Sequence, residues 1–215
     1  MKALADKSVD HVICDPPYDE RTHERARSLK DGGSDIDINF DPLASMQHVS
    51  ELLRVARRWV ICFCSVEQVG AYADAAGSVR WIRAGIWHRT DGTPQISGDR
   101  PAQSAEGIAI MHGPEIKKRW NGGGNRGHWS CGVERDNREH PTQKPLLLME
   151  RLVRDFTDPG DLILDPFAGS GTTGVAAIRL GRRFIGFERD PKYHAIATKR
   201  LTATREQLGL FAEGA

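Results

Sequence analysis

The stretch DLILDPFAGSGTTG at residues 161–174 is the most informative part of this sequence about its fold. A short apolar run leads into a glycine-rich turn, and a run with helical spacing follows. Gly169, Gly171 and Gly174 match the pattern G-x-G-x-x-G, in which glycines allow a tight turn and a close approach of the backbone to a bound cofactor. A strand, a tight turn and a helix in this order are typical of a parallel sheet whose crossover connections are helices.

The rest of the chain repeats this alternation of apolar strands and amphipathic helices. Strands are predicted at residues 9–14, 59–64, 81–88, 107–112, 161–164 and 183–187. Helices are predicted at 41–56, from 65 onward, and at 145–156, 172–180 and 190–201. Asp41 with Pro42 is a helix start signal, and Ser65 with Gln68 forms a capping box. We therefore predict one α/β domain over residues 1–201, with a mostly parallel sheet, helices on both faces and a tail at 202–215.

The composition is that of an ordinary globular domain. The chain has 215 residues, of which 39% are hydrophobic and 27% charged, and its formal net charge is +1. It has no run of about eighteen apolar residues, so no membrane contact is expected, and its first residues lack the apolar core of a signal peptide. Four cysteines without a C-x-x-C pair and eight histidines without zinc spacing predict no metal site and reduced cytoplasmic thiols.

Two carboxylates beside the glycine-rich turn indicate the kind of cofactor. Asp165 ends the apolar run before the turn, and Glu188 ends the next predicted strand, near the position where an acidic residue binds ribose hydroxyls. A carboxylate at Asp165 repels a pyrophosphate but attracts a positively charged cofactor. S-adenosylmethionine has a sulfonium, an ammonium and a ribose, and no phosphate. The charges therefore favour the methyl donor over a nicotinamide dinucleotide, although Asp165 is also placed to cap the following helix.

Three motifs in a fixed order resemble the amino-group DNA methyltransferases. They are DPPY at residues 15–18, HPTQKP at 140–145 and DPFAGSGTT at 165–173. The order, with the catalytic motif first and the cofactor loop last, is similar to that of the circularly permuted beta class. The resemblance covers residues 7–201 and implies a Rossmann-like, S-adenosylmethionine-dependent methyltransferase fold.

The resemblance also implies which residues bind S-adenosylmethionine. The expected cofactor residues are Asp165, Phe167, Gly169, Gly171, Thr172, Glu188, Thr142 and Lys144. Thr142 and Lys144 are expected near the carboxylate of the methionine part.

The DPPY turn is suited to make a nucleophile of an amino group whose lone pair is delocalised into a base. Asp15 is expected to accept one hydrogen bond from that amino group and the Pro16 carbonyl the other, and both bonds strengthen as positive charge develops on nitrogen. Pro16 and Pro17 hold these acceptors rigidly. Tyr18 offers a ring face on which a flipped-out base can stack. Without the other two motifs, a plain proline turn would be an equal explanation.

The leading Asp of DPPY, in place of Ser, resembles members that methylate adenine. The expected partner is double-stranded DNA and the expected target is adenine, with cytosine as the alternative. A methyltransferase for RNA or a protein amide is also compatible with this turn, and so is a catalytically inactive DNA-binding relative.

Residues 113–139 are the candidate target-recognition insert, and residues 117–132 within it show no periodicity. Its basic, amide and aromatic side chains are suited to phosphates and base edges. The expected DNA-binding residues are Lys117, Lys118, Arg119, Trp120, Asn121, Asn125, Arg126 and His128. Trp120 or Trp129 would stack on a base or anchor the segment in the core. The loop at residues 19–40 is expected to close over the flipped base and to be mobile without DNA.

The segment EQLGLF at residues 206–211 resembles the pentapeptide that binds the bacterial sliding clamp. The matching positions are Gln207, Leu208, Leu210 and Phe211, and a hydrophobic tail packed on its own domain is the alternative. Beta-class relatives are often dimers, so a homodimer is a further expected partner. In that class a strand often precedes the DPPY strand, whereas here Val9 lies close to the first residue; we expect a longer natural protein or a member without this strand.

Overall fold

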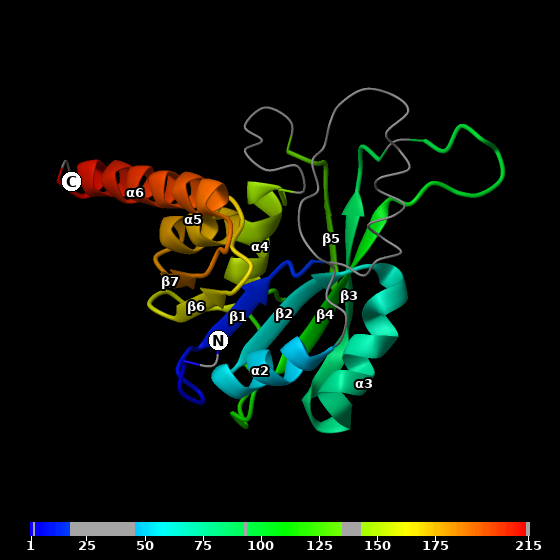
Figure 1. Ribbon diagram of the computed structural model, residues 1–215, viewed down its shortest axis with the longest axis horizontal. Coiled ribbons are helices and arrows are strands. Elements are labelled where there is room, and N and C mark those ends of the chain that lie inside the picture. The colour runs from blue at the N-terminus through cyan, green and yellow to red at the C-terminus, as the bar shows by residue number, and fades with distance from the viewer. Residues whose placement is uncertain (2, 18–45, 93, 135–142, 214–215) are drawn as a thin grey trace.

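The computed structural model describes residues 1, 3–17, 46–92, 94–134 and 143–213, with only the backbone at 210–213. Its centre is a seven-stranded sheet in the order β5-β3-β4-β2-β1-β6-β7 (Figure 1). The strands are β1 (His11–Cys14), β2 (Trp59–Cys64), β3 (Trp81–Arg89), β4 (Ala105–His112), β5 (His128–Cys131), β6 (Leu162–Asp165) and β7 (Arg183–Gly186). The predicted α/β fold is confirmed.

Strand direction defines two ends of this sheet. β1 is parallel to β2 and β6, β6 is parallel to β7, and β3 is parallel to β5. β4 runs antiparallel to both β2 and β3. Six described strands therefore finish at the same end, which we call the carboxyl end of the sheet. β4 begins there and finishes at the opposite, amino end.

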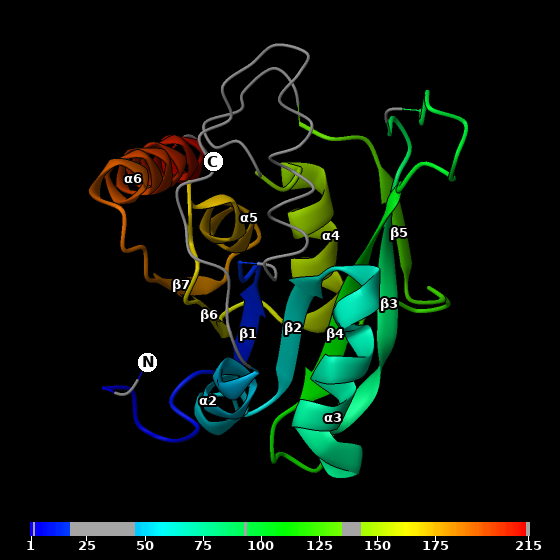
Figure 2. The same cartoon turned by 45° about the vertical axis from the view of Figure 1, so that its right-hand side comes forward.

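Helices cover the two faces of the sheet (Figure 2). One face carries α4 (Leu146–Phe156), α5 (Thr172–Arg179) and α6 (Pro191–Glu213), and the other carries α2 (Gln47–Val55) and α3 (Val69–Arg80). Alternate residues of the strands supply the two cores, because successive side chains of a strand point to opposite faces. In β1, Ile13 packs with Leu148 of α4, whereas Val12 packs with Leu52 of α2.

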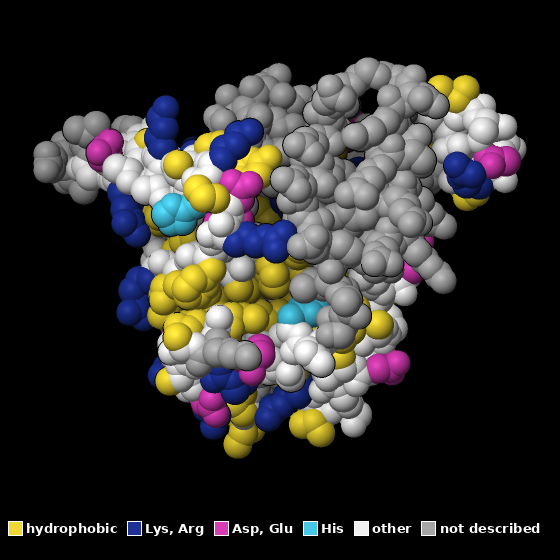
Figure 3. Space-filling model, in the orientation of Figure 1, with side chains coloured by type: hydrophobic (Ala, Val, Ile, Leu, Met, Phe, Trp, Pro, Cys, Tyr) yellow, Lys and Arg dark blue, Asp and Glu magenta, His cyan; other side chains and the backbone are white. Residues whose placement is uncertain are grey.

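The second face is incompletely covered over β6 and β7. Hydrophobic side chains gather there (Figure 3). Leu162 and Ile185 are only partly buried in this part of the core. Among the described residues, β7 has only β6 as a neighbour. No described helix is long and apolar enough to span a membrane.

Most predicted boundaries agree with the structure. Ser65 and Gln68 form the expected capping box, at a short 3-10 turn (Val66–Gln68) that leads into α3. The predicted helix start at Asp41 and Pro42 lies outside the described residues, as does the predicted mobile loop at 19–40.

Two predictions about regular structure are wrong. The segment 117–132, predicted to be irregular, contains β5, because tertiary pairing with β3 supplies a strand that no local period indicates. The last helix was predicted to end near residue 201, but α6 continues through Glu213. Residues 202–213 therefore belong to this helix, and the sequence from 202 to 213 contains no proline that would end it.

Candidate active site

The carboxyl end of the sheet collects the acidic residues that the sequence singled out. Asp15 follows β1, Asp165 ends β6, and Glu188 lies just after β7. These strands are neighbours in the order β1-β6-β7. Residues from the two ends of the chain therefore meet, since the ends of adjacent parallel strands meet at the same end of a sheet.

Asp15 is held in a turn of two prolines directly after β1. Pro16 is buried, and the Asp15 side chain is 25% exposed. The Oδ2 atom of Asp15 accepts a hydrogen bond from the Nζ atom of Lys144 at 2.6 Å. Tyr18 lies outside the described residues, so its stacking role stays a prediction.

Asp165 is buried beneath the glycine-rich loop and organises it. Its Oδ2 atom accepts a hydrogen bond from the Thr173 hydroxyl at 2.6 Å, and its Oδ1 atom accepts one from the Phe167 amide at 2.9 Å. Burial, together with the charges of Asp15 and Glu188, raises the pKa of Asp165 to about 7, although its two hydrogen bonds act in the opposite direction. A positively charged group placed here would relieve this unfavourable concentration of carboxylates.

The glycines of the loop have the geometry that the pattern predicts. Gly171 is the N-cap residue of α5 and has a φ of +82°, in the left-handed region where glycine carries no steric penalty. A Cβ atom at Gly174 would lie 2.6 Å from atoms of both Phe184 and Leu201, so this glycine allows α5 to approach β7 and α6 closely. Gly171 and Gly174 therefore serve the turn and the helix packing respectively.

A side chain that sequence reasoning missed secures the loop from α6. Arg200 donates hydrogen bonds from Nη1 to the Ser170 carbonyl at 2.6 Å and to the Thr172 hydroxyl at 3.2 Å. The Thr172 hydroxyl, predicted to contact the cofactor, therefore faces Arg200. Arginine in an ordinary helical run gives no signal of this contact in the sequence.

Glu188 supports the loop from the neighbouring strand. Its Oε2 atom accepts from the Gly169 amide at 2.8 Å and its Oε1 atom from the Asp190 amide at 2.8 Å. The adjacent Phe187 is 43% exposed and presents an apolar ring beside this carboxylate. Binding of ribose by Glu188 stays a prediction, and Phe187 is a candidate neighbour of the cofactor that sequence reasoning missed.

The HPTQKP segment contacts both the glycine-rich loop and the DPPY turn. Gln143 Oε1 accepts from the Ser170 hydroxyl at 3.0 Å, which ties this segment to the glycine-rich loop. Lys144, predicted to bind the cofactor carboxylate, instead extends to Asp15 and to Glu106 of β4. His140, Pro141 and Thr142 lie outside the described residues. Gln143 and Glu106 were not predicted as site residues.

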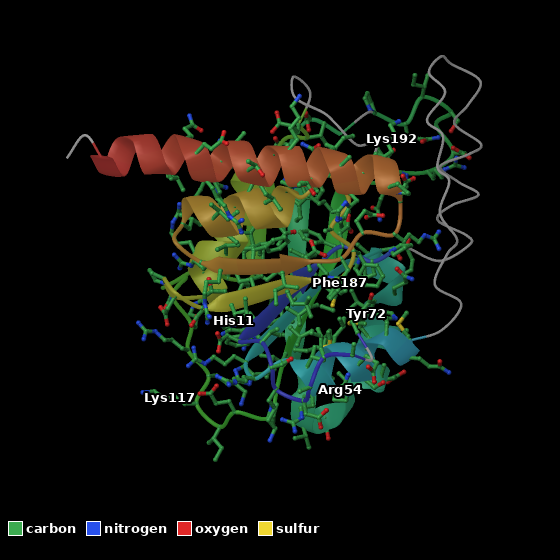
Figure 4. All side chains as sticks on the ribbon, turned by 60° about the vertical axis from the view of Figure 1, so that its left-hand side comes forward. His11, Arg54, Tyr72, Lys117, Phe187 and Lys192 are labelled. Carbon is green, nitrogen blue, oxygen red and sulfur yellow. The ribbon has the colours of Figure 1, made fainter. Side chains whose placement is uncertain are left out.

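The structure does not bring the predicted recognition residues to this site. Because β4 runs antiparallel, the segment after it begins at the amino end of the sheet. Figure 4 shows Lys117 at the opposite end of the molecule from Lys192, which lies in the first turn of α6 beyond Glu188. To contact a target base bound at Asp15, residues 117–128 would have to lie near the carboxyl end of the sheet. Their position at the amino end does not support the predicted contacts. Gly132 and Val133, just after β5, are back at the carboxyl end, where the Val133 amide donates to Asp91 Oδ1 at 3.0 Å.

Residues 117–129, at the amino end of the sheet, are rich in asparagine, arginine and tryptophan because these side chains make structural contacts. They secure the segment to the C-terminal end of α4. Arg119 forms an ion pair with Asp158 at 3.1 Å, Asn121 donates to the Thr157 carbonyl at 2.9 Å, and Asn125 donates to Asp155 Oδ2 at 3.4 Å. Within the segment, Asn125 Oδ1 accepts from the amides of Gly127 and His128. The rings of Trp120 and Trp129 both contact Phe156 edge-on or tilted. Lys117, Lys118 and Arg126 are exposed.

The remaining predicted features concern thiols and the C-terminal segment. All four cysteines are free, and the Sγ atoms of Cys14 and Cys62 lie 3.6 Å apart across β1 and β2. In the part of the chain that the structure describes, no group of His, Cys, Asp and Glu could hold a metal ion. Gln207 and Leu208 are exposed on α6, whereas the side chains of Leu210 and Phe211 lie outside the description.

Comparisons with known proteins place this geometry in context. The model of the DNA methylase family N6_N4_Mtase matches residues 9–199. Type II methyltransferase M2.DpnII of Streptococcus pneumoniae is 30% identical over 96% of this chain and 87% of its own length. Type II methyltransferase M2.LlaDCHI of Lactococcus lactis subsp. cremoris is 29% identical over 94% of this chain and 85% of its own.

Solved structures show the same architecture. The crystal structure of the M1.HpyAVI–SAM complex superposes with a TM-score of 0.70 at 28% identity, covering 93% of this chain and 91% of that one. The cytosine-N4-specific PvuII DNA methyltransferase, at 16% identity, covers 96% of this chain and 87% of its own with a TM-score of 0.64. This second likeness concerns the fold alone.

Proposed function

The chain belongs to the DNA methylase family and is a DNA methyltransferase that uses S-adenosylmethionine, and we propose that it methylates the exocyclic amino group of adenine in double-stranded DNA. The observation that carries this proposal is the position of Asp15, at the end of β1 and next to the glycine-rich loop of β6. An acceptor for an amino group thus lies beside the expected site of the methyl donor. We assign adenine as the target base because the DPPY turn begins with Asp; cytosine is the alternative target.

The carboxylates of the site fit a cationic cofactor. Asp165 is buried, and its pKa is raised to about 7 by burial and by the neighbouring Asp15 and Glu188. When bound, S-adenosylmethionine supplies a methyl group on a positively charged sulfur. Asp165, Gly169, Gly171, Glu188 and Phe187 are the residues that we propose to hold it. The backbone at Gly169 and Gly171 allows close approach of the adenosine part.

Asp15 and the Pro16 carbonyl would prepare the target amino group. Each accepts one of its hydrogens, which draws nitrogen toward a tetrahedral state with its lone pair available. In methyl transfer a nitrogen–carbon bond would form and the sulfur–carbon bond of the cofactor would break. Positive charge would then develop on the target nitrogen, and Asp15 and the Pro16 carbonyl would bind it more strongly. Loss of one amino proton to Asp15 and then to solvent leaves the neutral methylated base. Tyr18 would stack on the base that has left the duplex.

The structure suggests a different DNA-contacting segment from the one predicted. The loop between β3 and β4 lies at the carboxyl end, and its described residues, 90–92 and 94–104, extend away from the sheet (Figure 1). Ile96 is 92% exposed, and Arg100 has a side chain that is 67% exposed. An exposed apolar side chain can enter a base step, and an exposed arginine can bind a phosphate. We include the described residues of this β3–β4 loop, together with residues 132–134, in the proposed DNA surface.

We also propose further partners and a cellular location for the protein. A homodimer, a sliding-clamp contact through Gln207, Leu208, Leu210 and Phe211, and a bacterial or phage cytoplasm are expected from the sequence. Helical structure through Glu213 means that an extended peptide would require the end of α6 to unwind. Clamp binding by the intact protein, and its loss in Phe211→Ala, would support this contact. Equal pull-down by both proteins, or by neither, would contradict it.

Nucleoside analysis tests the proposed reaction directly. The protein is incubated with tritiated S-adenosylmethionine and unmethylated phage DNA, and the DNA is then digested to nucleosides. Label in methyladenine is the expected result. Label in methylcytosine would correct the base and leave the reaction unchanged. Absence of label in DNA, with label in RNA or protein incubated in parallel, would overturn the proposed substrate.

A further inference from the structure

Lys144 occupies a buried position between two carboxylates at the carboxyl end of the sheet. Its Nζ atom lies 2.6 Å from Asp15 Oδ2 and 3.2 Å from Glu106 Oε2. It also lies over two aromatic rings, 5.0 Å from the ring centre of Phe63 and 6.0 Å from that of Trp87. The lysine side chain is 9% exposed. Four strands thus surround the ammonium: β1, just before Asp15, and β2, β3 and β4.

The two carboxylates keep this lysine charged. Burial alone would lower the pKa of Lys144, but the negative charges of Asp15 and Glu106 outweigh it, so the pKa is raised. A charged lysine in this place forms a charge-assisted hydrogen bond that fixes the direction of the Asp15 carboxylate. Such a buried arrangement is costly to assemble relative to apolar packing, and so it is a weak explanation of stability alone.

Glu106 connects this arrangement to the β3–β4 loop. Its Oε1 atom lies 3.8 Å from Nη1 of Arg89, the last residue of β3. Arg89 is bonded to the returning end of the loop, where its amide donates to the Ser104 carbonyl at 2.7 Å and its side chain donates to the Gln103 carbonyl. Alternating charges therefore extend across the carboxyl end from Asp15 to the base of a loop in the proposed DNA surface.

We propose, on the basis of the proposed function, that Lys144 and Glu106 are positioning residues for Asp15. Lys144 orients the carboxylate that accepts the target amino group, and Glu106 places Lys144 by holding its ammonium within 3.2 Å. The role differs from the one that the sequence indicated, in which Lys144 binds the carboxylate of the cofactor. It also differs from a purely structural role, because orientation of an acceptor affects methyl transfer more than cofactor binding.

The test compares Lys144→Met and Glu106→Gln with wild type and with Arg58→Met. Arg58 is the matched control because it also lies between two carboxylates, Glu115 and Asp161, but at the amino end of the sheet. Three quantities are measured for each protein: the affinity for S-adenosylmethionine by calorimetry, the single-turnover rate of DNA methylation at saturating cofactor, and the pH dependence of that rate. Circular dichroism and thermal unfolding verify that each variant is folded.

A positioning role predicts a specific pattern of results. Lys144→Met lowers the single-turnover rate by about 100-fold and changes cofactor affinity by less than about threefold. The acid limb of its pH–rate profile moves to higher pH, because a carboxylate without its neighbouring ammonium binds a proton more readily. Glu106→Gln, which keeps a hydrogen-bond acceptor, lowers the rate by about tenfold. Arg58→Met leaves the rate and its pH profile unchanged.

Other outcomes overturn the inference. A loss of cofactor affinity in Lys144→Met with an unchanged rate at saturation would identify a cofactor ligand instead. Equal rates in wild type and Lys144→Met would leave DNA methylation in place and remove the positioning role. If Lys144→Met does not fold, Glu106→Gln decides: a wild-type rate and pH profile in that variant would contradict the inference. A wild-type protein that labels no DNA would overturn the proposed function, and the inference with it.

Discussion

The two ends of the sheet carry ion clusters of the same kind in different surroundings. At the carboxyl end, Lys144 lies between Asp15 and Glu106 with a side chain that is 9% exposed. At the amino end, Arg58 lies between Glu115 and Asp161 at 2.9 and 3.3 Å, and its side chain is 31% exposed. A cation between two carboxylates is thus buried at the carboxyl end, and the same arrangement is closer to solvent at the amino end.

This difference separates residues that serve the reaction from residues that serve the fold. At the amino end polar groups join neighbouring strands of the sheet: Asp161, just before β6, binds His11 of β1 at 2.9 Å and also accepts from the Asp158 amide at 2.7 Å. At the carboxyl end Asp15, Asp165 and Glu188 concentrate negative charge where loops leave the sheet. Ligands bind at this end of parallel sheets because adjacent connections diverge there.

The largest effect is expected for the Asp15 carboxylate. Asp15→Asn should reduce the single-turnover rate of methyl transfer by about 1,000-fold or more, because the amide is a weaker acceptor for an amino group that becomes positive. Cofactor affinity should stay within about threefold of wild type. Asp161→Asn is the matched carboxylate at the amino end, and its rate should equal that of wild type. Similar losses of rate in both variants would break the distinction between the two ends.

The next effect concerns the pH dependence of cofactor binding. In the free protein the pKa of Asp165 is raised to about 7, so this carboxyl is mostly protonated below pH 7. A cationic cofactor binds the carboxylate better than the protonated form, and so it must displace this proton. Affinity for S-adenosylmethionine, measured by calorimetry, should rise by up to about tenfold per pH unit as pH increases toward 7 and then level off. In Asp165→Asn this rise should disappear. An identical pH dependence in the variant would show that another group is responsible.

A smaller effect on stability is expected at the amino end. Burial alone would raise the pKa of Asp161, but the hydrogen bonds from His11 and the Asp158 amide, with the charge of Arg58, lower it. A lowered pKa in the folded state stabilises the protein above the unfolded-state pKa of about 3.9, and this contribution is lost as pH falls through the folded-state value. Asp161→Asn should therefore lower the free energy of unfolding by about 1–2 kcal/mol at pH 7.

Urea unfolding at pH 7 and near pH 3 measures this contribution. The difference between wild type and Asp161→Asn should decrease at the lower pH, because the unfolded chain binds a proton at Asp161 below its pKa of about 3.9, which favours unfolding of the wild type. A difference that grows toward pH 3 would contradict the assignment.

The smallest effect is expected for the exposed lysines of the amino end. The double substitution of Lys117→Ala and Lys118→Ala should change DNA affinity by less than about threefold, and the salt dependence of binding should stay the same. Arg100→Ala in the β3–β4 loop should weaken binding severalfold and reduce the salt slope by about one. Fluorescence anisotropy over a range of salt concentrations measures both. The opposite ranking would return the recognition role to the segment after β4.

Local patterns were enough to predict most of the helices and strands and the two motifs at the ends of β1 and β6. The continuous apolar run WVICFC and the glycine spacing of residues 169–174 depend only on neighbours in sequence, and β2 and the turn before α5 lie at the predicted positions. β5 was missed, since four residues without a clear period become a strand only by pairing with β3. The end of α6 was misplaced because no breaking residue marks it and the helix continues by propagation.

The fold class, the family and the acidic residues of the site could all be predicted from the sequence, because short-range periodicity and motif spacing are retained in any folded arrangement of the chain. The contacts of the long side chains, in contrast, depend on the tertiary structure. The reversed direction of β4 moved Lys117 to Arg126 to the amino end and brought Glu106 to the carboxyl end. There Lys144 meets both Glu106 and Asp15, the latter 129 positions away in the sequence. Contacts over such separations depend on strand order and direction, which are set by packing of the whole sheet.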